Sequence, residues 1–282
     1  MSDTAIPLVE ANGARIPALG FGTWPLKDAE CERAVSVALE AGYRHLDTAQ
    51  MYGNEAEVGR ALRASGLPRD DVFVTTKVWH DQLGPGPFEA AAAQSVERLG
   101  IGPVDLLLIH WPQRGMAVQT MIEGLANAHA AGFCRHVGVS NFPAAMLGEA
   151  VEAMGQLGGP LLVANQCEYH PELDQSATLA VCREAGMAFT AYAPLGKGSA
   201  MDNAVLTEIA EAHGKTPAQV ILRWHIQQPQ VVAIPKSGTP ERIRQNIAIG
   251  DFALSDAEMA RIHGLAHAGG RRLRPDWGPD FD

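Results

Sequence analysis

The segment Val104-Asp-Leu-Leu-Leu-Ile-His110 has the length and composition of a buried β-strand, and it ends on a residue type that does chemistry. Tyr43-Arg-His-Leu-Asp47 and Val72-Phe-Val-Thr-Thr-Lys77 follow the same plan and end on Asp and Lys. Four later stretches are similar, the last with a proline before its Lys: residues 137–141, 162–166, 188–192 and 231–236. The first six strand ends recur at intervals of roughly 30 residues, the length of one strand, one helix and two loops.

Enzymes built on parallel barrels carry their chemistry at the C-terminal ends of the strands. The pattern therefore predicts an α/β protein with a (β/α)8 TIM barrel and one polar site at its mouth. The chain has 282 residues, enough for one barrel of about 250 residues and a short extension. We therefore expect residues 1–282 to form a single domain.

The ends of the chain differ from the repeating units. Two short alternating runs, residues 6–10 and 14–17, flank Asn12-Gly13, which is typical of hairpin turns. We expect residues 1–17 to form a hairpin over the bottom of the barrel, followed by a weak first barrel strand at residues 18–22. Residues 269–282 form a C-terminal extension without periodicity. Helices are expected at residues 29–41, 55–64, 87–99, 118–131, 143–154, 174–185, 202–213 and 217–227.

Composition excludes several classes of protein. A hydrophobic content of 46% with 19% charged residues fits a globular protein with a large core. The net charge of −10 argues against general nucleic-acid binding, which needs a basic surface. The four cysteines show no CxxC spacing, and we find neither a signal peptide nor a run of 18 apolar residues. We expect a cytoplasmic protein with no membrane contact, and a monomer.

Four residues at or near the strand ends, Asp47, Tyr52, Lys77 and His110, form a chemically sensible set. A phenol is a poor acid near neutrality, but a nearby ammonium stabilises its phenolate, and a carboxylate keeps that ammonium in place. A histidine beside them can orient a carbonyl oxygen. Taken singly, such an Asp usually caps a helix, a Lys is usually solvated and a His is more often structural. Their convergence at one barrel mouth favours a general-acid site for reducing a carbonyl.

The local sequences resemble the signatures of the aldo-keto reductases from about Leu19 to Asn246. The first block is Gly42-Tyr-Arg-His-Leu-Asp-Thr-Ala-Gln-Met-Tyr-Gly-Asn-Glu-Ala-Glu-Val-Gly59. The others are Thr75-Thr-Lys-Val-Trp79, Val104-Asp-Leu-Leu-Leu-Ile-His-Trp-Pro112, Val137-Gly-Val-Ser-Asn-Phe142, Asn165-Gln-Cys-Glu-Tyr-His-Pro171 and Ile234-Pro-Lys-Ser-Gly-Thr-Pro-Glu-Arg-Ile-Arg-Gln-Asn246. The short tail resembles the bacterial diketogluconate-reductase-like branch. The resemblance implies that Tyr52 is the general acid, that Lys77 and Asp47 tune it, and that His110 orients the substrate carbonyl.

The resemblance also implies NADPH as cofactor, bound without a GxGxxG motif. It assigns Ser140, Asn141 and Gln166 to the nicotinamide carboxamide and Tyr192 to stacking on the nicotinamide ring. Lys236, Ser237 and Arg242 would hold the 2′-phosphate, with Asn246 near the adenine. The remaining cofactor contacts that it implies are Thr23, Asp47 and Leu195. Gly238 and Thr239 depart from the pattern, because other members often have bulkier residues there.

The residues around Arg242 support a phosphate site by themselves. Thr239 as N-cap and Pro240 at the first helical position predict a helix start, which offers free N–H groups to an anion. Lys236 and Arg242 add positive charge beside it. A ribose-hydroxyl site would want a carboxylate instead, for which Glu241 is the candidate. Solvated surface charges on a helix are the alternative interpretation.

Trp24, Trp79 and Trp111 each follow a strand end and are expected to bind substrate together with Tyr52 and His110. Ordinary core packing is the alternative, above all for Trp79. We predict no metal site, because no pair of potential ligands has zinc-type spacing and Lys77 in the same pocket would repel a cation. His45 and His170 are instead expected to be structural histidines.

We therefore expect an NADPH-dependent aldo-keto reductase that acts on a small-molecule carbonyl, such as a keto-sugar acid, methylglyoxal or a simple aldehyde. Two other functions remain open. One is a cofactor-binding regulatory module of the same fold with little turnover, and the other is a metal-dependent hydrolase barrel. The complete set of four residues favours the reductase.

Overall fold

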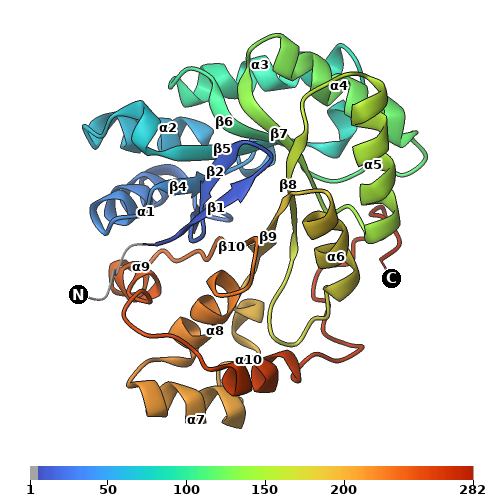
Figure 1. The fold of residues 1–282 in the computed structure, drawn as a ribbon. Helices are drawn as coiled ribbons and strands as arrows, with labels where there is room; N and C mark the ends of the chain where they lie inside the picture. The colour runs from blue at the N-terminus through green and yellow to red at the C-terminus, as the bar shows by residue number, and fades with distance from the viewer. Residues whose placement is uncertain (1–5, 282) are drawn as a thin grey trace.

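The computed structural model describes residues 6–281, and its centre is a closed sheet of parallel strands (Figure 1). The strands follow one another around the sheet in chain order, from β3 to β10. A bridge between Leu19 and Ala233 joins the first strand to the last, with Gly20 N donating to Ala233 O at 2.8 Å. The strands are β3 (Phe21–Gly22), β4 (His45–Asp47), β5 (Phe73–Val78), β6 (Val104–Ile109), β7 (Cys134–Ser140), β8 (Leu162–Glu168), β9 (Ala188–Tyr192) and β10 (Val231–Ala233). The predicted (β/α)8 barrel is confirmed.

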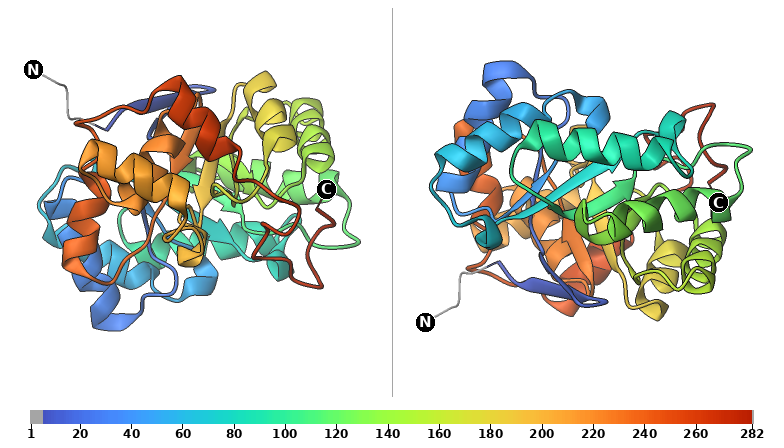
Figure 2. Two further views of the ribbon diagram at one scale, coloured as in Figure 1. Left: turned by 90° about the horizontal axis from the view of Figure 1, so that it is seen from below. Right: turned by 90° about the horizontal axis from the view of Figure 1, so that it is seen from above.

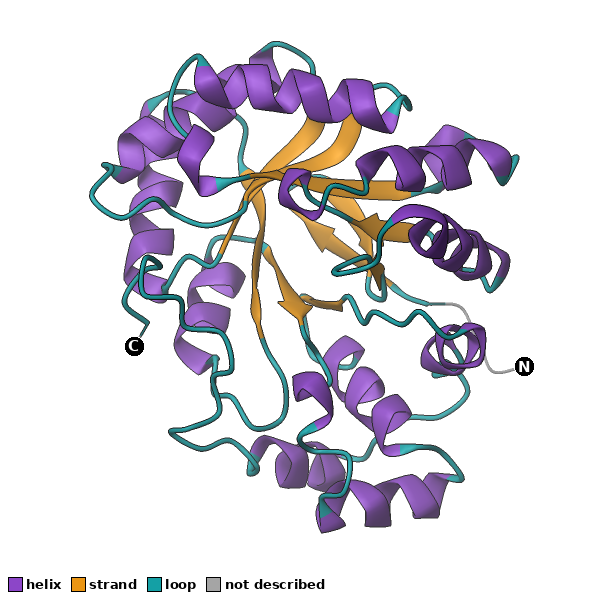
Figure 3. Ribbon diagram, turned by 180° about the vertical axis from the view of Figure 1, so that it is seen from behind, coloured by secondary structure: helices purple, strands orange, loops and turns teal. Residues whose placement is uncertain are grey.

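Helices surround this sheet on the outside, as Figure 3 shows with helices in purple and strands in orange. Most strands are followed by one helix, and the long step before β10 contains two, as expected from its length. The helices are α1 (Asp28–Glu40), α2 (Glu55–Ala64), α3 (Pro87–Leu99), α4 (Val118–Ala130), α5 (Ala144–Gln156), α6 (Ser176–Glu184), α7 (Ala204–His213), α8 (Pro217–Ile226), α9 (Pro240–Ile247) and α10 (Asp256–His263). The main apolar core lies between the two layers.

A few boundaries differ from those expected, and each has a local cause. The first strand is only β3, because residues 18–20 contribute a bridge rather than a full ladder. Helix α6 begins at Ser176 instead of 174, because the Asp174 carboxylate accepts from Ser176 N and forms a turn there. At α8 the predicted start at residue 217 is confirmed, since Thr216 accepts from Gln219 N as the N-cap and Pro217 is the first helical residue.

The N-terminal hairpin pairs β1 (Leu8–Ala11) with β2 (Ala14–Pro17) in antiparallel register around Asn12 and Gly13. Both turn residues have positive φ, 45° and 88°, as a two-residue hairpin turn requires. Asn12 Nδ2 donates to Leu162 O at 2.7 Å and to Ala185 O at 2.9 Å, at the start of β8 and just before β9. Ile16 packs inside the barrel. The hairpin therefore covers the N-terminal end of the barrel, as predicted.

The C-terminal segment after α10 has neither helix nor strand up to residue 281. Figure 2 shows it in dark red beside the green segment that follows β6, and Arg114 pairs there with Asp280 at 3.0 Å. No helix within residues 6–281 is long and apolar enough to cross a membrane.

Two helical glycines give a matched test of packing around the barrel. A Cβ on Gly59 of α2 would lie 1.8 Å from Leu99 O at the end of α3, whereas one on Gly148 of α5 would meet nothing within 4 Å. We expect Gly59→Ala to lower the free energy of unfolding by about 1–3 kcal/mol or more, because the backbones must separate. Gly148→Ala should raise it by about 0.5–1 kcal/mol. Urea denaturation measures both, and equal effects of the two substitutions would contradict the close approach.

Candidate active site

The register of neighbouring strands brings Asp47, Lys77 and His110 to one face of the sheet. Asp47 pairs with Thr75, which lies two residues before Lys77, and Lys77 pairs with Leu108, which lies two residues before His110. Side chains alternate along a strand, so a step of two residues keeps the same face. All three side chains therefore point into the barrel near its C-terminal end.

Tyr52 reaches this group through the short 3-10 helix Gln50–Tyr52, which turns the chain back over the end of β4. Lys77 Nζ donates to Asp47 Oδ1 at 2.5 Å and to Thr48 O at 2.8 Å, and lies 3.3 Å from the Tyr52 hydroxyl. The rings of Tyr52 and His110 are 5.5 Å apart and meet edge to face. The structure thus brings all four predicted catalytic residues together.

Burial and the Lys77 charge act in opposite directions on Tyr52. Burial raises the pKa of Tyr52 above its ordinary value, and the Lys77 ammonium lowers it by a smaller amount. Lys77 lowers this pKa as expected, but the net shift is upward. Burial alone would lower the pKa of Lys77, yet Asp47 and Tyr52 raise it above its usual range. Near neutrality Lys77 is therefore charged and Tyr52 carries a proton to give.

His110 is held as a neutral imidazole. Burial lowers its pKa well below the ordinary value, and the Lys77 charge lowers it further. Trp79 packs edge to face against it at 4.9 Å, and Asn141 Nδ2 donates to its carbonyl oxygen at 2.9 Å. A neutral imidazole can donate one hydrogen bond to a ligand oxygen.

A second polar network lies beside the first, at the ends of β7, β8 and β9. The Tyr192 hydroxyl donates to Asn141 Oδ1 at 2.8 Å, and Ser140 Oγ donates to Gln166 O at 2.7 Å. Gln166 Nε2 donates to Asp47 Oδ2 at 2.7 Å. Asp47 therefore links the two networks.

One cavity of about 1380 Å³ connects these networks to the predicted phosphate-binding residues. Of the predicted catalytic residues, Asp47, Tyr52 and His110 line it. The predicted cofactor residues along it are Thr23, Asp47, Asn141, Gln166, Tyr192, Leu195, Lys236, Ser237, Arg242 and Asn246. Ser140 is the exception, because it is buried behind Gln166 and does not line the cavity.

The far end of the cavity carries positive charge at the start of α9. Within residues 6–281, neither Lys236 nor Arg242 has an acidic partner within 4.0 Å. Thr239 occupies the N-cap position, but its side chain makes no capping bond. Ser237 Oγ instead accepts from Thr239 N at 3.0 Å and holds the loop in place.

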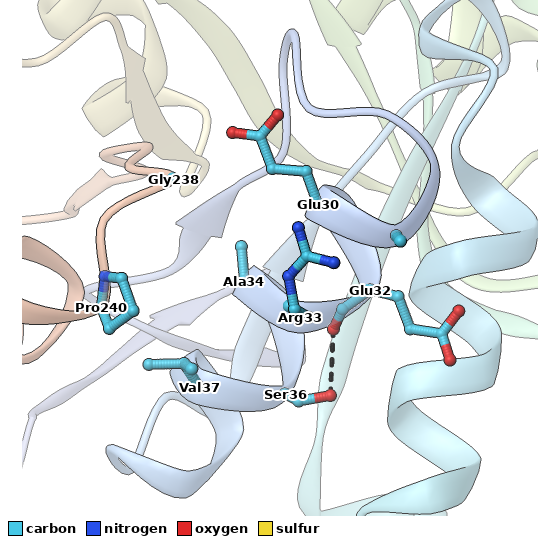
Figure 4. Close-up of a pocket in the computed structure, with 9 residues that line it drawn as sticks. Glu30, Glu32, Arg33, Ala34, Ser36, Val37, Gly238 and Pro240 are labelled. Carbon is cyan, nitrogen blue, oxygen red and sulfur yellow. Dashed lines mark hydrogen bonds between the residues drawn. The ribbon is translucent and has the colours of Figure 1, made fainter.

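Sequence reasoning missed Glu30, which faces this end of the cavity from the first turn of α1. A second pocket of about 590 Å³ lies between α1 and the start of α9, and Figure 4 shows Glu30 and Arg33 there opposite Gly238 and Pro240. Glu30 lines both cavities, and a Cβ on Gly238 would lie 2.6 Å from its Oε1. The one hint in the sequence was Gly238, where related proteins often have a bulkier residue. No local sequence pattern, however, indicates that Glu30 is the residue that lies against it.

Four tryptophans line the mouth of the cavity. The expected Trp24, Trp79 and Trp111 are joined by Trp277 from the C-terminal tail. Trp277 stacks on His80 at 4.3 Å and meets Trp79 at 5.5 Å and Trp111 at 5.4 Å. Because the tail has no periodicity, no sequence pattern indicates that Trp277 lies at the site.

The histidines expected to be structural have structural partners. His45 Nε2 lies 3.1 Å from Thr75 Oγ1, and His170 Nε2 lies 3.3 Å from Glu168 Oε1. Among the residues that the structure describes, no three His, Cys, Asp or Glu side chains are grouped as metal ligands.

A parallel barrel with buried titratable groups at its mouth, beside a large cavity that is cationic at one end, has the features of an enzyme for a small-molecule ligand. The profile of the Aldo/keto reductase family matches residues 18–267. An aldo-keto reductase of Mycobacterium sp. (strain MCS) is 47% identical over 274 residues, which cover 96% of this chain and 94% of that protein. The chain belongs to the aldo/keto reductase family, and it is an oxidoreductase of this NADP-dependent family.

Solved structures agree with this assignment. A protein provisionally named 2,5-diketo-D-gluconic acid reductase B has a TM-score of 0.95 and 44% identity, covering 99% of this chain and 98% of its own. An aldo-keto reductase from Bombyx mori in complex with NADP has a TM-score of 0.87 and 32% identity, covering 96% of both chains. These relatives support a nicotinamide cofactor.

The neutral state of His110 can be measured directly. We expect its imidazole resonances not to titrate between pH 5 and 8, because burial and Lys77 keep its pKa far below the ordinary value of about 6.5. Since the unfolded chain would bind this proton and the folded chain would not, His110 should lower stability as the pH falls. NMR titration, with His110→Asn for assignment, measures this. A midpoint at or above 6.5 would contradict the electrostatics described above.

Proposed function

We propose that this protein is an NADPH-dependent reductase of aldehydes and ketones, with Tyr52 as general acid. The observation that carries the proposal is the contact of Lys77 Nζ with both Asp47 Oδ1 and the Tyr52 hydroxyl in the wall of the cavity. As an aldehyde or ketone is reduced, negative charge develops on its oxygen and must be neutralised. A protonated phenol beside a fixed ammonium meets that need.

Each residue has a distinct part in this mechanism. Neutral His110 donates a hydrogen bond that orients the substrate carbonyl, and Tyr52 gives its proton to the oxygen. Lys77 stabilises the phenolate that remains, and Asp47 keeps Lys77 charged and in place. NADPH, when bound, supplies the hydride to the carbonyl carbon. The burial of Tyr52 opposes loss of its proton, so the Lys77 charge is needed most once that proton has left.

The side chains along the cavity fit a nicotinamide cofactor. Gln166 donates to Asp47 through Nε2, and its Oε1 accepts no bond from the described residues, so it is available to a carboxamide N–H. Lys236, Ser237 and Arg242 fit the 2′-phosphate, because two cations stand beside a helix start and lack acidic partners in the described chain. Glu30 opposes this preference, since a carboxylate in that position repels phosphate and suits a ribose hydroxyl.

The mouth of the cavity suggests the class of substrate. Four tryptophan rings offer flat apolar surface, and Arg274, which makes no ion pair among the described residues, lines the same cavity. Arg272 also lines it but pairs with Glu172. This combination suits a small carbonyl compound that also carries a carboxylate, because an arginine fork pairs well with that group. We propose keto-sugar acids as substrates, with methylglyoxal and simple aldehydes reduced as well.

Tyr52→Phe tests the general acid. We expect the rate of reduction to fall about 10²–10⁴-fold, because the proton donor is lost, while NADPH affinity stays nearly unchanged. Steady-state NADPH oxidation with nitrobenzaldehyde and a fluorescence titration of NADPH measure the two properties. Tyr43→Phe is the matched control, since the Tyr43 hydroxyl contacts only Ile243 O, at 3.3 Å, among the described residues. If Tyr52→Phe kept more than about a tenth of the activity, another group would be the acid.

Arg242→Ala tests the cofactor preference. We expect NADPH binding to weaken by about 1.5–3 kcal/mol, the scale of a charged hydrogen bond, with little change for NADH. Glu30→Gln should act in the opposite direction and strengthen NADPH binding. Arg244→Ala controls for charge on the same helix, because Arg244 does not line the cavity. Equal losses of NADPH and NADH binding in Arg242→Ala would refute the 2′-phosphate assignment.

A further inference from the structure

Glu168, the last residue of β8, binds the C-terminal tail through its side chain. Its Oε1 accepts from Arg272 N and its Oε2 from Leu273 N, both at 2.9 Å, and His170 Nε2 lies 3.3 Å from Oε1. The side chain of Glu168 is fully buried. A tail without helix or strand has few backbone–backbone hydrogen bonds. The Glu168 carboxylate therefore holds the tail backbone in place, as the hydrogen bonds of a neighbouring strand would in a sheet.

The charge of Glu168 is maintained by these contacts. Burial alone would raise its pKa, but the hydrogen bonds from His170, Leu273 and Arg272 outweigh burial and bring the pKa below its ordinary value. Hydrogen bonds to an ionised acceptor are stronger than those between neutral groups. The other ion pairs of the tail, Arg272 with Glu172 and Arg114 with Asp280, are more exposed and contribute less.

The segment that Glu168 holds also lines the substrate end of the cavity. Arg272, Leu273, Arg274, Pro275 and Trp277 all lie along it. Trp277 stacks on His80 with an angle of 17° between the rings, and it packs against Trp79 and Trp111. Glu168 itself does not line the cavity. Its place two residues beyond Gln166 on β8 puts it at the rim, below the tail.

We propose that Glu168 is a positioning residue for substrate binding. By fixing the backbone at Arg272 and Leu273, it sets the position of the tail, so that Trp277 completes the aromatic wall beside Tyr52 and His110. Glu168 acts through Trp277 and does not touch the substrate. This inference rests on the proposed function only for the identity of the ligand that the wall receives.

Glu168→Gln in the full chain tests the proposal without change of size. An amide replaces one acceptor oxygen by an NH₂ group that faces a backbone N–H, so at least one tail bond is lost. Hydrogen exchange followed by mass spectrometry should show faster exchange in the peptide covering residues 268–281, with the barrel strands unchanged. This measurement needs no substrate, so it stands even if the wild-type protein reduces no carbonyl compound.

Kinetics give the second measurement. We expect KM for 4-nitrobenzaldehyde to rise roughly tenfold, the effect of losing one charged hydrogen bond, with NADPH affinity unchanged. Glyceraldehyde, which is too small to need the tail, should show a much smaller change. Trp277→Ala should raise KM for 4-nitrobenzaldehyde in the same way. Because both residues act through one structure, adding Glu168→Gln to Trp277→Ala should have little further effect.

Glu55→Gln is the matched control for loss of a buried carboxylate. Glu55 is 1% exposed and accepts from Thr76 Oγ1 at 2.6 Å, and Arg98 lies within 2.6 Å of it, away from the tail. This variant should lower the melting temperature without changing exchange in residues 268–281. If Glu168→Gln does not fold, Leu273→Pro removes one tail donor from the other side and should give the same exchange and KM changes. Unchanged tail exchange, or fully additive effects of the Glu168 and Trp277 substitutions, would overturn the proposal.

Discussion

The buried ion pair between Lys77 and Asp47 is the interaction on which the site depends. Their side chains are 0% and 2% exposed, and removing two charges from water costs several kcal/mol unless every polar atom finds a partner. Lys77 meets that condition, because its three ammonium protons match three acceptors: Asp47 Oδ1, Thr48 O and the Tyr52 hydroxyl. The Tyr52 hydroxyl therefore replaces one of the water molecules that would bind the lysine ammonium in solution. The strand register sets Asp47 opposite Thr75 and so beside Lys77, and the short helix after β4 brings the Tyr52 hydroxyl to the same ammonium.

Residues in regular elements could be predicted from the sequence, because strand alternation and the βα repeat determine their positions. His110 is an example, since the apolar run of β6 ends at Ile109 and leaves the next side chain at the mouth. Trp277 could not be predicted in this way. Its place depends on a buried carboxylate at the end of β8 that binds a tail without periodicity. Glu30 was missed for a related reason, because it meets Gly238 through the packing of α1 beside α9.

Propensity also failed to predict the hydrogen bonds at the start of α9. Thr239 has the residue type and position of an N-cap, yet its side chain makes no cap bond, and its own backbone N–H donates to Ser237 Oγ. The helix start was predictable, but its hydrogen bonds were not. The direction in which the pKa of Tyr52 shifts could not be predicted either. The charge of Lys77, which lowers this pKa, is evident from the sequence, but the burial of the phenol, which raises it, depends on the fold.

The site separates chemistry from recognition, and Asp47 is the point where its two networks meet. In the proposed mechanism, Asp47, Lys77 and His110 lie at or next to strand ends held by the barrel ladder, and Tyr52 lies on the short helix after β4. Recognition at the mouth is left largely to loops and the tail. Asp47 accepts a hydrogen bond from Lys77 at Oδ1 and another from Gln166 at Oδ2. A cofactor that forms hydrogen bonds with Gln166 would therefore also affect the Asp47 carboxylate. That carboxylate holds Lys77 in place, and Lys77 in turn contacts Tyr52. In the proposed mechanism, cofactor binding and the placement of Tyr52 are therefore coupled through Asp47, whereas changes in the tail alter which carbonyl compound reaches the site.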